Sequence, residues 1–259
     1  MRSLKALMLS CGLLLSATAA DAHTPFMKPV NFHPNTEWTS AQAGYSTQIF
    51  CPNVGISGPD LTVIAPDGRR LAFSSVQVSQ YETALETALP LAGTYRLTTG
   101  EVMGPVERMI YQRGRWRALR ANETPPRRTR ISTMQMVEVA ESYVTRGEAT
   151  RAAIEPVVGT LAIRPITHPN QVTAASGADL QLLFNGAPFA RMPFVVYERG
   201  DSEDDMHRAF VTNSEGRAHL TFDHPGLYLI AVRYRPEMPA GASVDVRSYS
   251  TTLTLEVTQ

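Results

Sequence analysis

Short apolar and β-branched runs separated by glycine, asparagine and proline fill the chain from Gly159 onward. Runs of this length that are bounded by turn residues are typical of β-strands. Close spacing of many such runs is typical of a β-sandwich, so we expect one over residues 158–259. The predicted strands are Thr160–Ile166, Asp179–Phe184, Phe194–Glu198, Arg208–Thr212, Ala218–Phe222, Gly226–Arg233 and Ser250–Val257.

The preceding residues, 23–157, predict a separate β-rich domain with hairpin punctuation, including Asp67-Gly68 and Gly100. A longer run, Ser132–Val144, fits neither a clean period of two nor a helical stripe, and its Thr, Val and Tyr content favours a strand. We therefore expect an all-β protein of two β-sandwich modules. The clearest strands of this domain are Leu61–Ala65, Arg70–Val76, Thr94–Thr99 and Met109–Gln112.

The segment 1–22 has the pattern of a cleaved secretory signal peptide. Two basic residues precede an apolar stretch, and Ala20-Asp21-Ala22 supplies a small-residue cleavage pattern. We expect export to the periplasm and a mature chain that begins at His23. No later segment has the roughly 20 apolar residues that a membrane-spanning helix needs, so no stable span is expected in the mature form.

Net charge and cysteine content exclude few classes of binding partner. The whole chain is formally neutral, and loss of the signal leaves a charge of −1, which argues against a general nucleic-acid binder. Cys51 is the sole mature cysteine and is expected to be a buried small hydrophobe.

Residues 113–130 carry seven arginines and predict either a solvated hairpin or a basic surface for lipid headgroups or an acidic partner. Residues 201–205 lack calcium-loop spacing and predict an exposed acidic turn.

The second half of the chain resembles a known periplasmic family. It contains, in order, ESYVTRGEAT, GTLAIRPITHPN, LLFNGAPF, TNSEGRAHLTFDHPGLYLIAV and SYSTTLTLEV. This succession resembles the domain of unknown function DUF4198, and the start AHTPFMKP fits it more loosely. The resemblance implies a periplasmic all-β protein of two sandwich-like modules, and we expect the second module to be Ig-like or prealbumin-like. It also implies a relation to a periplasmic component of cobalt or nickel uptake.

Signal cleavage would give His23 a free α-amine beside its imidazole, and these two nitrogens can chelate a transition metal such as nickel, cobalt or copper. Further ligands must come from elsewhere. His33 and His168 are the first choices, and Met27 is a softer donor for copper(I). Ordinary structural or surface roles are expected for the remaining histidines, His207, His219 and His224.

The sequence offers no hydrolase motif and no nucleophile with a visible partner, so a non-enzymatic role is expected. The leading hypothesis is a periplasmic accessory protein that passes a metal ion or metal complex to a membrane transporter or outer-membrane receptor component. The main alternative is a non-catalytic protein–protein interaction module of the cell envelope. A remote alternative is a copper-dependent polysaccharide monooxygenase that uses His23 and a second histidine.

Overall fold

A computed structural model describes residues 23–58, 60–112, 115–120 and 122–259. The predicted signal peptide and Arg113 lie outside these residues. Within them the structure contains strands and no helix, so no helix could cross a membrane. The strands are β1 (Thr24–Pro29), β2 (Trp38–Ser46), β3 (Thr62–Ile64), β4 (Arg70–Leu71), β5 (Ser75–Val78), β6 (Thr83–Ala88), β7 (Gly93–Thr98), β8 (Val102–Gln112), β9 (Arg115–Ala118), β10 (Ile131–Arg146), β11 (Leu161–Pro165), β12 (Ala178–Phe184), β13 (Ala187–Pro188), β14 (Pro193–Glu198), β15 (Ala209–Val211), β16 (Arg217–Leu220), β17 (Gly226–Tyr234) and β18 (Val246–Val257).

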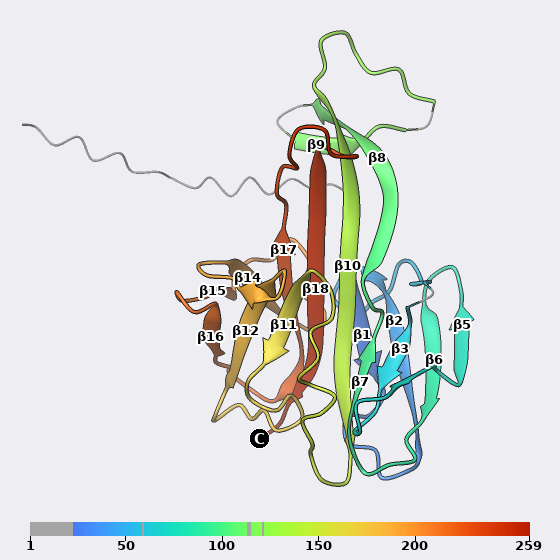
Figure 1. Cartoon of the computed structure of the whole chain (residues 1–259), viewed down its shortest axis with the longest axis vertical. Coiled ribbons are helices and arrows are strands. Elements are labelled where there is room, and N and C mark those ends of the chain that lie inside the picture. Colours follow the sequence, from blue (N-terminus) through green and yellow to red (C-terminus); the bar gives the residue numbers. More distant parts are fainter. Residues whose placement is uncertain (1–22, 59, 113–114, 121) are drawn as a thin grey trace, which may run out of the picture.

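One central sheet runs through both halves of the chain. Its main path is β15-β14-β17-β18-β10-β7-β3-β4, and β8 pairs with β10 and with β9. The halves meet where β10 and β18 pair in parallel, from Met134 opposite Val246 to Ser142 opposite Thr254. These two long strands lie side by side along the molecule in Figure 1. The predicted boundary near residue 158 falls between β10 and β11, but the two halves share this sheet.

Each face of the central sheet is covered by a smaller sheet. Successive residues of a strand point to opposite faces, and β10 shows this clearly. Val137 and Tyr143 belong to a core shared with β11, β12 and β16, whereas Ala140 and Val144 belong to a core shared with β2 and β6. The first covering sheet has the order β11-β12-β13 with β16 beside β12, and the second has the order β1-β2-β6-β5. The fold is therefore a three-layered all-β structure.

A third buried cluster joins β1 to the second half of the chain. Phe26 of β1 and the loop residues Ile49 and Phe50 pack with Tyr197 of β14 and Leu229 of β17. The Thr252 hydroxyl of β18 also donates a hydrogen bond to the Pro25 carbonyl at 2.9 Å. Because β1 contacts β10 and β18, β1 is held over the junction between the halves.

The strand predictions are confirmed for the second half and for β10, although several end residues shift. The Asn185-Gly186 turn is also confirmed, since both residues have the positive φ angles (52° and 76°) that this hairpin turn requires. The pattern did not indicate β1, β2, β6 or the first half of β8. In β2 and β6 much of the buried face is Thr, Ser and Ala, which carry little hydrophobic signal.

An arm formed by residues 102–131 projects beyond the two covering sheets. Its described residues are those of β8, β9, the tip-loop residues 119–120 and 122–130, and the first residue of β10, and Figure 1 shows it rising past the body of the molecule. β8 pairs with β10 along one edge, and only its last residues, Met109–Gln112, pair with β9 on the other. The predicted arginine-rich hairpin and loop therefore lie on this arm.

Candidate metal-binding site at the amino-terminal histidine

His23 lies immediately before β1 and beside the carboxylate of Glu203, on the turn between β14 and β15. The His23 Nδ1 atom is 3.9 Å from Glu203 Oε1. The Thr24 hydroxyl donates a hydrogen bond to the other carboxylate oxygen, Oε2, at 3.1 Å. Nδ1 is buried and receives no hydrogen bond from the residues that the structure describes. An uncommitted nitrogen and a positioned carboxylate therefore face one another.

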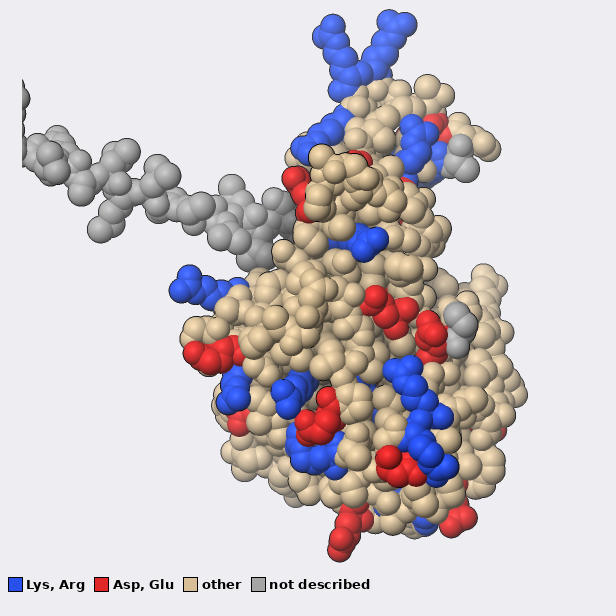
Figure 2. All heavy atoms as spheres, viewed as in Figure 1, with Lys and Arg blue, Asp and Glu red and all other residues tan. Residues whose placement is uncertain are grey.

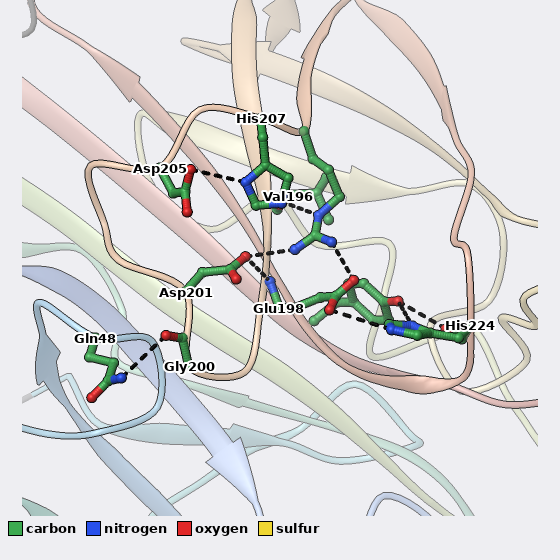
Figure 3. Close-up of polar contacts among 10 residues, drawn as sticks. Gln48, Val196, Glu198, Gly200, Asp201, Asp205, His207 and His224 are labelled. Carbon is green, nitrogen blue, oxygen red and sulfur yellow. Dashed lines mark hydrogen bonds and ion pairs between the residues drawn. The ribbon is translucent and has the colours of Figure 1, made fainter.

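The turn that carries Glu203 is held by a loop from the first half of the chain. The Ile49 backbone N–H donates to the Asp201 carbonyl, and the Glu203 N–H donates to the Thr47 carbonyl, both at 2.8 Å. The Gln48 amide also donates to the Gly200 carbonyl at 3.3 Å, as Figure 3 shows. These bonds place the carboxylate beside His23, although the two residues lie far apart in the sequence.

Burial shapes the electrostatics of this site. Partial removal from water raises the pKa of Glu203, while the Thr24 hydrogen bond, Arg233 and His23 act in the opposite direction. The exposed fraction of the His23 side chain is 31% and that of Glu203 is 17%. The two side chains are therefore partly removed from water, which strengthens the electrostatic interaction between them.

Asp201 of this turn and Glu198 at the end of β14 are held by Arg208. Arg208 donates from Nη2 to Asp201 at 2.6 Å and from Nη1 to Glu198. Asp201 also accepts the Glu198 N–H at 2.7 Å. Figure 3 shows both carboxylates turned toward the same guanidinium. The prediction of an acidic turn in place of a calcium loop fits this arrangement, but Glu203 is largely buried.

His168, predicted as a ligand, is instead buried in a hydrogen-bond network. Its Nε2 lies 3.0 Å from the Thr94 hydroxyl and 3.1 Å from the Thr150 carbonyl. Its Nδ1 accepts the Asn170 N–H at 3.2 Å, and Asn170 accepts a bond from the Thr145 hydroxyl at 2.9 Å. Burial lowers the pKa of His168. Nε2 thus joins this segment to β7, Nδ1 holds Asn170 within the segment, and the Asn170 side chain makes the link to β10.

His33 lies beyond the opposite end of β1 from His23. Its Nε2 is 4.0 Å from Glu256 Oε2, and about half of its side chain is exposed. The six residues of β1 alone span roughly 17 Å at ~3.4 Å per step. His23 and His33 are therefore not brought together, and among the described residues no three His, Cys, Asp or Glu side chains form a metal-holding group.

The other candidate donors have separate surroundings. His207 pairs with Asp205 at 3.0 Å and His219 with Asp179 at 2.9 Å, both on the surface. His224 Nδ1 is 2.8 Å from the Tyr228 hydroxyl, and Met27 is fully buried. The expectation of a buried Cys51 is wrong, because its loop closes through backbone bonds and leaves the thiol exposed.

Fold and site together define an all-β, three-layered protein with a histidine–carboxylate pair at the predicted mature start. The chain belongs to the family described as "Domain of unknown function (DUF4198)", which it matches over residues 20–236. No curated protein matches it. Among solved structures it is similar to the "D0-D1 domain of Intimin", with 11% identity, coverage of 90% of this chain and 97% of that chain, and a TM-score of 0.25.

Sequence reasoning missed Glu203 as a partner of His23. The acidic stretch 201–205 is evident in the sequence, but because its residues lack the spacing of a calcium-binding loop it indicates only an exposed acidic turn. Its proximity to His23 depends on the docking of residues 47–49 on the turn, which no local pattern encodes.

Proposed function

We propose that this protein is a non-enzymatic periplasmic accessory protein that binds a transition-metal ion, or a metal complex, for uptake or handling at the cell envelope. The observation that carries this proposal is the buried His23 Nδ1, which has no hydrogen-bond partner among the described residues and faces Glu203 at 3.9 Å. Signal cleavage after Ala22 would add the α-amine of His23 as a third donor.

The distance between the two side chains is compatible with a bridging ion after a small movement. Metal–nitrogen and metal–oxygen bonds of about 2.0–2.2 Å at an angle of 90–110° place the two donor atoms ~3 to 3.4 Å apart. Nδ1 and Oε1 would therefore approach each other by roughly 0.5–1 Å from their present separation. The α-amine and Nδ1 of one residue can chelate the same ion, and nitrogen donors favour copper, nickel or cobalt over calcium.

A set of three donors also suits temporary binding. Structural metal sites are usually closed by four protein ligands, whereas three ligands leave a position for water or an incoming group. An open position lets a second protein or a small chelator take the ion by ligand exchange. This property supports handling and transfer rather than permanent storage, with a membrane transporter or outer-membrane receptor component as the proposed recipient.

The test is calorimetric titration with copper(II), nickel(II) and cobalt(II) of protein exported to a periplasm, after mass spectrometry has verified that it begins at His23. The comparison proteins are a form with one extra residue before His23, a Glu203→Gln variant and a His33→Gln control. We expect micromolar or tighter binding that is lost in the extended form, falls at least tenfold in Glu203→Gln and is unchanged in His33→Gln. Equal binding by all four proteins, or none by any, would overturn the proposal.

The second candidate is the envelope protein–protein interaction module. It is supported by histidines that lie apart within the described residues, together with the exposed apolar and arginine side chains of the arm. Site-specific photo-crosslinking from position 103 on the arm and position 78 on β5 distinguishes a specific partner from random contact. A single crosslinked product from the arm alone, in protein that binds no metal, would favour this candidate. The monooxygenase alternative has less support, because neither His33 nor His168 joins His23.

A further inference from the structure

The arm concentrates the positive charge of the protein. Residues 102–131 contain eight arginines and two glutamates, a formal charge of +6, and because the whole chain is neutral the remaining residues carry −6. Separation of charge on this scale orients a molecule toward a surface of opposite sign before contact. The arm would therefore lead the approach to an anionic surface.

The arginines of the tip lie where such a surface could reach them. Arg120, Arg127, Arg128 and Arg130 are exposed, and Figure 2 shows basic side chains gathered at the end of the arm. Arg117 binds Glu123, which lowers the pKa of that carboxyl to about 2. Glu123 is the only acidic residue between positions 108 and 130. The tip therefore presents an excess of guanidinium groups.

Apolar and aromatic side chains accompany these charges. Tyr111 and Ile131, near the end of the arm, are 45% and 41% exposed, and Met103 and Val106 are exposed nearer the body. The rings of Tyr111 and Trp116 lie 5.4 Å apart, and Arg130 is placed over the Trp116 ring at 5.4 Å. Aromatic residues next to basic ones are typical of the interface between lipid headgroups and acyl chains, where a ring can be partly buried while its polar atom stays hydrated.

We propose that the arm binds the protein to an anionic phospholipid membrane, with the tip arginines on lipid phosphates and the exposed side chains of Tyr111 and Ile131 in the headgroup region. Guanidinium groups bind phosphate through two parallel hydrogen bonds. A narrow, convex tip can contact a flat array of phosphates through a few residues. This inference does not depend on metal binding at His23.

The test uses the processed protein and sedimentation with mixed vesicles of phosphatidylethanolamine and phosphatidylglycerol, beside vesicles of phosphatidylcholine alone. The arm variant is Arg120→Gln/Arg127→Gln/Arg128→Gln. The matched control, Arg70→Gln/Arg199→Gln/Arg217→Gln, removes three exposed arginines of the body. We expect binding to the anionic vesicles only, weakened by added salt, reduced at least tenfold in the arm variant and within twofold of the unsubstituted protein in the control. Each basic residue near an anionic surface contributes roughly fivefold to binding, and salt screens that contribution.

Tryptophan emission adds a readout specific to the arm. The chain has two tryptophans, so a Trp38→Phe variant leaves Trp116 as the reporter. We expect its emission to shift to shorter wavelength on addition of the anionic vesicles. Absence of vesicle binding by the unsubstituted protein, or equal loss in the arm variant and the body control, would overturn the proposal. If the protein does not bind vesicles but its arm crosslinks to an acidic envelope protein, the partner of the arm is a protein and the lipid proposal is wrong.

Discussion

Arg96 of β7 and Glu141 of β10 form a two-point ion pair in which each residue is only 1% exposed. Arg96 Nε donates to Glu141 Oε1 at 2.8 Å, and Nη2 donates to Oε2. Arg96 Nη1 also donates to the Pro156 carbonyl, so the pair anchors the segment after β10 to the sheet. Burial is the largest single influence and acts to lower the pKa of Arg96, but the interactions with Glu141 and Tyr143 together outweigh it and raise that pKa.

Glu141→Gln should strongly destabilise the protein, because it leaves the Arg96 charge buried without its counter-charge. Removal of one partner of a buried pair typically costs about 3–5 kcal/mol. The double variant Arg96→Met/Glu141→Leu should be more stable than Glu141→Gln, because no unpaired charge remains. Urea unfolding at pH 7 measures the three free energies. A double variant that is less stable than Glu141→Gln would contradict this account.

His168 should make stability depend on pH. Burial lowers its pKa in the folded protein, so below about pH 6.5, the ordinary histidine value, the unfolded chain takes up a proton more readily than the folded one. The stability that neutral, buried His168 contributes to the folded protein is fully present above pH 6.5 and is lost as the pH falls toward the folded-state pKa. His168→Gln should flatten the decline in unfolding free energy between pH 7.5 and 5.5, as measured by urea unfolding at several pH values. An equal decline in the unsubstituted protein and in His168→Gln would refute the assignment.

Gly177 should tolerate no side chain. Its φ is +66°, and a Cβ at this position would lie 2.1 Å from the Leu220 carbonyl oxygen, which is backbone and cannot rotate away. Gly186 has a similar φ of +76° but open space around it. Gly186→Ala should cost about 1 kcal/mol from the left-handed backbone alone, and Gly177→Ala on the order of 3 kcal/mol. Thermal unfolding of the two variants measures the difference between their losses of stability. Equal losses would show that β16 can move to accommodate a side chain at position 177.

Cys51 should react in the folded protein. Its side chain is exposed, so N-ethylmaleimide should label the native protein nearly as fast as the urea-unfolded chain. Cys51→Ser should change the free energy of unfolding by less than about 0.5 kcal/mol, as for other surface substitutions. Protection of the thiol until unfolding would show that its loop is covered in solution.

Much of the local structure could be predicted from the sequence by itself. The apolar periodicity and turn residues indicated the strands of the second half, the long β10 and the Asn185-Gly186 turn, because these depend on neighbouring residues and local φ/ψ preferences. The family pattern in residues 141–259 likewise indicated the membership that the match over residues 20–236 establishes. The histidine at the predicted mature start could also be recognised from its place after Ala22.

The tertiary structure decided how distant segments meet. Parallel pairing of β10 with β18, the burial of His168 and the placement of Glu203 beside His23 depend on contacts between segments that lie far apart in the sequence. Such contacts are selected by burial of whole sheet faces and by backbone pairing between loops, and a local pattern does not encode them. The sequence could therefore nominate His23, while only the packing of residues 47–49 against the 199–205 turn supplied its carboxylate partner.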